Sequence, residues 1–165
     1  MGSFNEHISQ ANNNLEFLSQ INNSSNPHWD WHVTTCFYIA LHLMNAHIVE
    51  KTKGNYLSHS QVGQVLNPYS RLSTAKLDED TYKSYNKLMQ LSRRSRYLLN
   101  EGIRNEGQTD IQKACITYDK HFCKAIYHLD VVMQYLSKNY AVTFKSRSLT
   151  CIELKGRKFD HFTVN

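Results

Sequence analysis

Apolar residues recur at three- and four-residue steps over most of the chain, which is the spacing of helices that bury one face. The first such stripe runs over residues 4–21. Ser3 and Glu6 have the spacing of a capping box, in which each side chain binds the backbone N–H of the other residue. We therefore predict a first helix here. Its core positions are Phe4, Ile8, Ala11, Leu15 and Leu18.

Three further helices follow from local start and stop signals. The second begins at Asn26-Pro27, because Asn caps helices well and Pro is tolerated in the first turn. A short third helix covers 58–66, where Ser58 and Gln61 again have capping-box spacing. After a loop over 67–77, a fourth runs from Asp78 to about Asn100, with acidic residues in its first turn. The core stripe of the second helix is Val33, Phe37, Leu41, Met44 and Ile48.

A fifth, long helix is predicted from Thr109, which has capping-box spacing to Gln112. Its apolar stripe is Ile111, Cys115, Tyr118, Phe122, Ala125, Leu129, Val132 and Leu136. After Asn139 the period changes to two, which is typical of strands. Two alternating runs, 140–144 and 150–154, flank a polar break, and we predict a β-hairpin with a third short strand over 159–164.

These elements predict an all-α fold. We expect an antiparallel four- to five-helix bundle over residues 1–138 and a basic β-hairpin tail over 139–165. Two strands alone are marginal in water, so the tail is expected to pack on the bundle or on a partner.

Charge changes this picture only at the C-terminal end. The formal charge is +5, and the chain from Lys138 onward holds six basic residues against Glu153 and Asp160. Such a tail either contacts nucleic acid or an acidic partner, or is a solvated surface. Residues 1–18 lack the apolar stretch of a signal peptide, and no apolar run approaches bilayer length, so we expect a cytoplasmic protein that does not enter the membrane.

The sequence gives little indication of a metal site or of an activated nucleophile, although it contains nine histidines. His28 and His32 share a helix face, but Trp29 stands where a metalloprotease motif requires Glu. Cys115 and Cys123 flank Asp119 at helical spacing, yet Cys115 belongs to a core stripe, which favours a buried thiol. We expect no metal and no cofactor, and structural roles for most histidines.

The segment Ser92–Tyr97 is the strongest candidate for binding. It holds three arginines and a tyrosine within two turns, and Arg93 and Tyr97 lie four residues apart. Guanidinium groups suit phosphates, but arginines also gather in structural ion pairs, and both interpretations stay open.

The residues around this segment resemble a known family. They read Trp31-His32, then Phe37-Tyr38-x-x-Leu41-His42-x-x-x-Ala46, then Ser58-His59, then Tyr85-x-x-Leu88-x-x-Leu91-Ser92-Arg93-x-x-Arg96-Tyr97, before a long amphipathic helix. This order resembles the HEPN superfamily of helical bundles over roughly residues 15–136. The resemblance implies an antiparallel bundle, often homodimeric, that either cleaves RNA or binds nucleotides, RNA or a partner nucleotidyltransferase, in toxin–antitoxin or defence systems.

Ribonuclease members of the family carry Arg followed by His after four to six intervening residues. No arginine of this chain has His at that spacing: Arg104 is followed there by Thr109, Asp110 and Ile111, and His161 is one residue too close to Arg157.

Three functions therefore stay open. The first is a non-catalytic HEPN-like module, expected to be homodimeric, that binds a phosphate-bearing ligand or a partner protein. Its expected ligand-binding residues are Arg93, Arg96, Tyr97, His59, Trp31 and His32. The second is a divergent ribonuclease, with Arg93 or Arg96 on phosphate and His59 or His42 as general base. The third is a structural subunit that docks through its tail. Small Ser92 and Ser95 are expected to allow close helix packing in a homodimer.

Overall fold

The computed structural model describes residues 2–25, 27–54, 58–103, 109–113 and 116–165. Most of them are helical, and five α-helices are present in these ranges. The first, α1 (Phe4–Asn22), starts at the predicted capping box: the Ser3 N–H donates to Glu6 Oε2 over 2.6 Å, and the Glu6 N–H donates to Ser3 Oγ over 3.3 Å. Its buried face holds Ala11, Leu15, Leu18 and Asn22.

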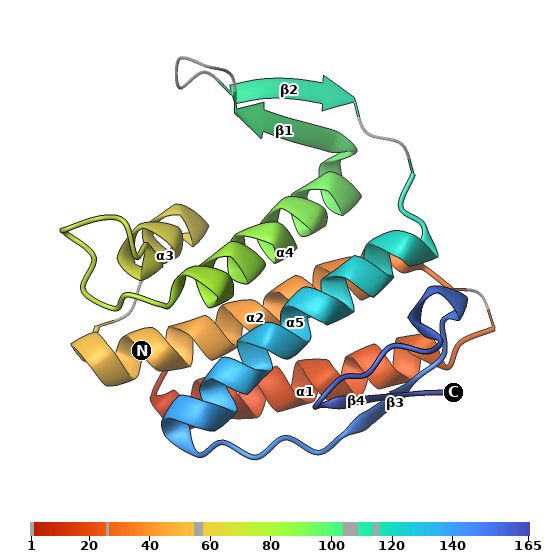
Figure 1. The fold of residues 1–165 in the computed structure, drawn as a ribbon, viewed down its shortest axis with the longest axis horizontal. Helices are drawn as coiled ribbons and strands as arrows, with labels where there is room; N and C mark the ends of the chain where they lie inside the picture. Colours follow the sequence, from red (N-terminus) through yellow and green to blue (C-terminus); the bar gives the residue numbers. More distant parts are fainter. Residues whose placement is uncertain (1, 26, 55–57, 104–108, 114–115) are drawn as a thin grey trace.

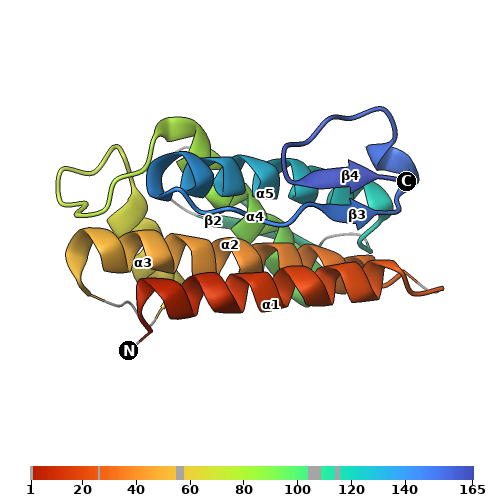
Figure 2. The same cartoon turned by 90° about the horizontal axis from the view of Figure 1, so that it is seen from below.

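The second helix, α2 (Trp29–Thr52), is the centre of the fold. It contacts α1, α3, α4 and α5, and α1 lies along it in both views (Figures 1 and 2). All five residues of its predicted stripe are buried. Its start differs from the prediction: Asn26 lies outside the described residues, and Pro27 precedes the helix. The first helical hydrogen bonds go to the carbonyl of His28, which receives the N–H groups of Trp31 and His32.

The third helix confirms the capping box predicted from the sequence, and the fourth begins one residue after the predicted start. The Ser58–Gln61 capping box opens α3 (His59–Leu66), and Asp78 Oδ1 accepts the Thr81 N–H at the start of α4 (Glu79–Tyr97). The predicted end of α4 was too late by three residues. Leu98 takes a left-handed conformation with φ of 52°, which stops the helix.

The prediction of a helix start at Thr109 was wrong. Residues Leu99–Ile103 form β1, which pairs antiparallel with β2 (Thr109–Lys113) and extends away from the helices (Figure 1). Thr109 and Ile111 are β-branched and alternate with Asp110 and Gln112, a strand pattern that the long helical stripe concealed. The fifth helix, α5 (Asp119–Tyr140), begins ten residues later than Thr109.

The C-terminal segment is not a hairpin. Residues Arg147–Leu149 form β3 inside the predicted polar break, and β3 pairs in parallel with β4 (Phe162–Val164). The predicted second strand is instead a short 3-10 helix, η1 (Ile152–Leu154). Asn22 of α1 explains the change: its side chain donates to the Thr150 carbonyl over 3.2 Å and accepts the Thr150 N–H over 2.7 Å, so that backbone needs no hairpin partner.

This segment shares its core with the helices. Five of its side chains are buried in the same apolar cluster, namely Phe144, Leu149, Cys151, Leu154 and Phe162. Docking also engages one of its basic residues, since Arg147 pairs with Glu16 of α1 over 2.6 Å. Arg157 is engaged within the segment itself, where its Nε donates to the Glu153 carbonyl over 3.2 Å. In the ranges that the structure covers, no helix has the length and apolar content that crossing a bilayer requires.

Candidate functional site

Arg96, near the end of α4, lies where α2, α3 and α4 meet. Its guanidinium carbon is 6.0 Å from the ring centre of Tyr38 on α2 and 5.0 Å from that of Tyr97. The ring of His59, at the first position of α3, is centred 6.4 Å from the Tyr38 ring and 5.2 Å from the buried Phe37 ring. Aromatic faces attract guanidinium groups, so the two tyrosines position Arg96.

His59 is uncharged at neutral pH in this setting. Partial burial lowers its pKa first, and the positive charges of Arg96 and Arg93 lower it further. An anion placed beside the two arginines would weaken that effect. The three residues therefore form a small electropositive group that favours negative charge.

Trp31 lies next to Arg96 at the surface, because both residues line one cavity. A cavity of about 250 Å³ is lined by Trp31 and Arg96, together with Asp30, Thr34 and Ser95. A second cavity of about 280 Å³ also includes Trp31 and Thr34, and it continues over α1 and α2. Its other lining residues are Gln10, Asn14, Phe17, Thr35, Tyr38 and His42.

His42 lies at the far end of the second cavity and is not beside Arg96. Its Nδ1 is 3.2 Å from Nδ1 of His7, so one ring donates and the other accepts. Burial lowers the pKa of His42, and the neighbouring His7 adds to the effect. Sequence reasoning named His42 but missed its partner, because the two residues are 35 positions apart.

His32 does not join the surface. It is fully buried, and its ring packs on Trp29 and Phe122. Its Nδ1 donates to the His28 carbonyl over 2.7 Å, and its Nε2 has no hydrogen-bond partner among the described residues. Trp31 and His32 are adjacent in sequence, but a helix turns successive side chains by about 100°. One therefore faces solvent and the other faces the core.

The predicted binding residues are thus brought together in part. Arg96, Tyr97 and His59 share one surface, Arg93 acts on His59 electrostatically, and Trp31 lies in the adjoining cavity. Sequence reasoning missed Tyr38, Phe17 and Thr34. The signal was present in α2, where Trp31, Thr34, Tyr38 and His42 follow one another at three- and four-residue steps as a second face beside the core stripe.

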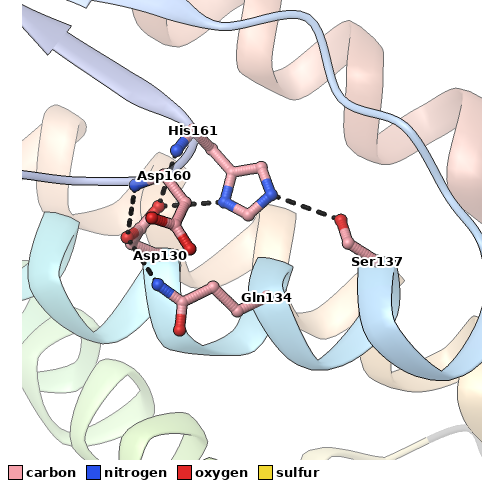
Figure 3. A network of polar contacts seen from close by, with 5 residues as sticks. All are labelled: Asp130, Gln134, Ser137, Asp160 and His161. Carbon is pink, nitrogen blue, oxygen red and sulfur yellow. Dashed lines mark hydrogen bonds and ion pairs between the residues drawn. The ribbon is translucent and has the colours of Figure 1, made fainter.

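A separate polar network joins the C-terminal segment to α5 (Figure 3). The Asp130 carboxylate accepts the ring Nδ1–H of His161 over 2.9 Å and the backbone N–H groups of Asp160 and His161, each over 3.0 Å. It also accepts the Gln134 side-chain amide over 3.0 Å. On the other side of the ring, His161 Nε2 lies 3.2 Å from Ser137 Oγ.

This order of serine, histidine and aspartate resembles a nucleophilic triad, but its surroundings favour a structural role. Burial alone would raise the pKa of Asp130, and the hydrogen bonds from His161 and Asp160 outweigh it and leave the pKa lowered. Acyl transfer also needs N–H donors aimed at the developing oxyanion. Ser137 lies inside α5, where backbone N–H groups are bonded within the helix. The network therefore ties β4 to α5.

A further cavity of about 790 Å³ lies between α4 and α5. Its lining mixes acidic Asp78 and Asp80 with basic Lys83 and Lys138, and Lys83 pairs with Glu79. His128 Nδ1 lies 3.2 Å from Ser84 Oγ in the same wall. Because opposite charges are interleaved, this groove has no clear preference for an anion or a cation.

In the part of the chain that the structure covers, no group of three or more His, Cys, Asp or Glu side chains is placed so that it could hold a metal ion. Cys115 lies outside the described residues, and Cys123 is buried with its thiol donating to the Glu153 carbonyl over 3.2 Å. Burial raises the pKa of Cys123, which keeps it protonated. His47 is a structural histidine: its Nε2 donates to the Ala75 carbonyl and its Nδ1 accepts from Tyr140.

Comparison with known proteins adds no further constraint: no family model, no curated protein and no solved structure matches this chain.

Proposed function

We propose that this chain is a non-catalytic binding module that takes a phosphate-bearing ligand, a nucleotide or RNA, at the surface formed by Arg96, Tyr38, Tyr97 and His59. The observation that carries the proposal is the position of Arg96 against two tyrosine rings, close enough to His59 for its charge to help lower the pKa of that histidine. Among the described residues Arg96 makes no ion pair, and its one hydrogen bond, from Nε to the Ser92 carbonyl, is long at 3.4 Å.

The chemistry of this group matches that of a phosphate. A guanidinium offers several N–H donors in a planar fork that fits phosphate oxygens, and the Nε contact leaves its two terminal nitrogens available. Aromatic packing restricts the side chain before the ligand arrives, which lowers the entropic cost of binding. A structural arginine would instead be expected to face a carboxylate.

The fold proposed to carry this surface is an antiparallel HEPN-like bundle that forms a homodimer. The order of helices and the residues shared with that family support it, and a nucleotidyltransferase or another toxin–antitoxin or defence protein is the partner that the resemblance favours. Ser92 and Ser95 are buried within the chain itself, so they offer no surface for a second copy. Light scattering at micromolar concentration tests the dimer.

A divergent ribonuclease is the second candidate, and one observation favours it. His59 is held uncharged beside Arg93 and Arg96, as a general base near a phosphate would be. We nevertheless expect no cleavage of total RNA or tRNA, because the spacing between arginine and histidine of the family's ribonucleases is absent. Chelator-resistant cleavage that His59→Ala abolishes would replace the binding function by this one.

The third candidate, a subunit that docks through its tail, receives less support. Five apolar side chains of that segment are buried in the core that it shares with the helices of the same chain, whereas Ile152 is exposed. Lys155 and Lys158 are exposed, so the tail could still contact a partner electrostatically through these two residues.

The binding proposal is tested with ATP and a fluorescein-labelled RNA of ten nucleotides, using calorimetry and fluorescence anisotropy. We expect Arg96→Ala to weaken both by at least about tenfold, in line with a lost charged hydrogen-bond donor. The same substitution should also reduce by about one the slope of the logarithm of the RNA-binding constant against the logarithm of the salt concentration. Arg71→Ala is the matched control, since Arg71 is exposed in the loop between α3 and α4 and carries the same charge. Equal affinities for the two variants would contradict the proposal.

A further inference from the structure

Three aromatic side chains line the two small cavities, namely Phe17, Trp31 and Tyr38, and Tyr97 adjoins them through its contact with Arg96. We call these four residues the aromatic strip. Phe17 comes from α1, Trp31 and Tyr38 from α2, and Tyr97 from α4. The exposed fractions of Phe17, Trp31 and Tyr97 are 46%, 58% and 58%. Arg96 lies against Tyr38 and Tyr97 and shares a cavity with Trp31, so one cation lies beside three of the four rings.

Single exposed apolar residues are normal on protein surfaces and need no explanation. Leu72 and Ile152 are of that kind, since each lies alone in a connecting segment. The strip differs because its members come from three helices: Phe17, Trp31 and Tyr38 line adjoining cavities, and Tyr97 contacts the arginine that lines one of them. A fold that needed only to be soluble would have no reason to hold aromatic rings around an arginine at this place.

We propose that the aromatic strip binds single-stranded nucleic acid, with the backbone phosphate at Arg96 and unpaired bases stacked on Trp31 and Phe17. This inference rests on the proposed function and narrows its ligand from any phosphate-bearing molecule to an oligonucleotide. A cationic group combined with aromatic platforms is how proteins hold single strands, because every base has a flat face that stacks.

The size of the surface favours an oligonucleotide over a mononucleotide. Each cavity, at about 250 and 280 Å³, is smaller than a usual ligand pocket, which starts at roughly 300 Å³. They meet at Trp31 and Thr34, so a ligand that fills one continues into the other. Trp31 and His42 are eleven residues apart on α2, which places them about 16 Å from one another along the helix axis.

The polar lining offers contacts for bases beyond stacking. Asp30 lines the first cavity, and carboxylates accept hydrogen bonds from the amino group of cytosine. Gln10 and Asn14 of α1 line the second cavity and are joined by a hydrogen bond of 3.1 Å from Gln10 Nε2 to Asn14 Oδ1. A duplex keeps its base faces internal, so it cannot use these platforms.

The test measures anisotropy of a labelled ten-nucleotide RNA and of the DNA of the same sequence, each single-stranded and as a duplex, with ATP as competitor. We expect single strands to bind at least tenfold more tightly than the duplex or ATP. Trp31→Ala and Phe17→Ala should each weaken single-strand binding by about five- to 100-fold, the usual effect of losing one stacked base. Trp31→Phe should keep most of the affinity, because a ring remains.

Tyr69→Ala is the matched control, since Tyr69 is equally exposed at 62% but packs on Tyr82 in a different part of the molecule. Circular dichroism of every variant separates lost binding from lost folding. The inference is overturned if Trp31→Ala and Phe17→Ala bind single strands as Tyr69→Ala does, or if duplex and ATP compete equally. Loss of binding in Arg96→Ala alone would then leave the proposed function standing, whereas no effect of Arg96→Ala would remove both.

Discussion

His161 and His59 both lie next to charged side chains, but their surroundings differ. His161 is buried between Asp130 and Ser137, and both of its ring nitrogens have partners in the chain. His59 is half-buried at the surface, where Arg96 and Arg93 disfavour its protonated form. The first histidine faces a carboxylate, and the second faces two cations.

This difference distinguishes a region that stabilises the fold, around Asp130, from a region proposed to bind a ligand, around Arg96. Around Asp130, the hydrogen bonds of a buried charge are satisfied by the chain itself, as a stable interior requires. Around Arg96, the cation is positioned by aromatic rings without a neutralising partner among the described residues. Changes in the first region should therefore alter stability and leave binding intact, and changes in the second should do the reverse.

The largest effect is expected from Asp130→Ala. Removing this carboxylate leaves the backbone N–H groups of Asp160 and His161 without their acceptor, and each buried group left unsatisfied costs about 1–3 kcal/mol of unfolding free energy. Urea denaturation measures it. Asp160→Ala is the control, because its side chain is exposed and only its backbone enters the network. Similar unfolding free energies for the two variants would show that the network does not hold the fold.

The same carboxylate should give an acid dependence of stability. The pKa of Asp130 is lowered in the folded chain, so the folded state binds its proton less readily than the unfolded state does. Its contribution is fully present above the unfolded pKa of about 4 and is lost as pH falls through the lower folded pKa. We expect the stability difference between the natural chain and Asp130→Ala to be constant from pH 7 to 5 and to shrink below pH 4. If the stability difference persists at pH 2, it arises from the packing of the Asp130 side chain and not from its charge.

Ser137→Ala should have a smaller effect, of about 0.5–1.5 kcal/mol, the net value of one hydrogen bond. The bond from Ser137 Oγ to His161 Nε2 is 3.2 Å long and lies on the side of the ring away from Asp130. Thermal unfolding is the measurement, with Ser19→Ala as the control because its hydroxyl bonds to its own helix. A loss as large as that of Asp130→Ala would mean that Ser137 orients the whole network.

Local signals were sufficient to locate the first four helices, although they missed the start of α2 and the end of α4. The capping boxes at Ser3 and Ser58 and the helical stripes act within a few residues, so the sequence alone reveals them. The C-terminal segment shows the opposite case. Ile152 and Leu154 have the alternation of a strand, yet one is 77% exposed and the other fully buried, because Asn22 of a distant helix binds the preceding backbone.

The candidate site shows the same division. Arg93, Arg96 and Tyr97 lie close in sequence and were predicted together, and the family resemblance added His59. Tyr38, Phe17 and the contact between His7 and His42 depend on how α1, α2 and α4 pack, which no periodicity specifies. Asp130 and His161 are separated by 31 positions, so their network was likewise hidden.

The smallest expected effect is the pH dependence of ligand binding at the surface around Arg96 and His59. The pKa of His59 is lowered by burial and by the charges of Arg96 and Arg93, so the free protein carries it uncharged at neutral pH. A bound phosphate would offset those charges, raise the pKa of His59 and promote its protonation. Binding would then take up a proton, and affinity for single-stranded RNA should rise by a few fold as pH falls from 7.5 to 6.

His59→Gln should remove most of this rise while leaving affinity at pH 7.5 nearly unchanged, because glutamine keeps a polar side chain that does not titrate. His128→Gln is the matched control, since His128 also has a pKa lowered by burial but lies between α4 and α5, away from the strip. Calorimetry in buffers of different ionisation enthalpy counts the protons taken up. An unchanged rise in His59→Gln would place the titrating group elsewhere, and His42, which lines the second cavity and contacts His7, would be the next residue to replace.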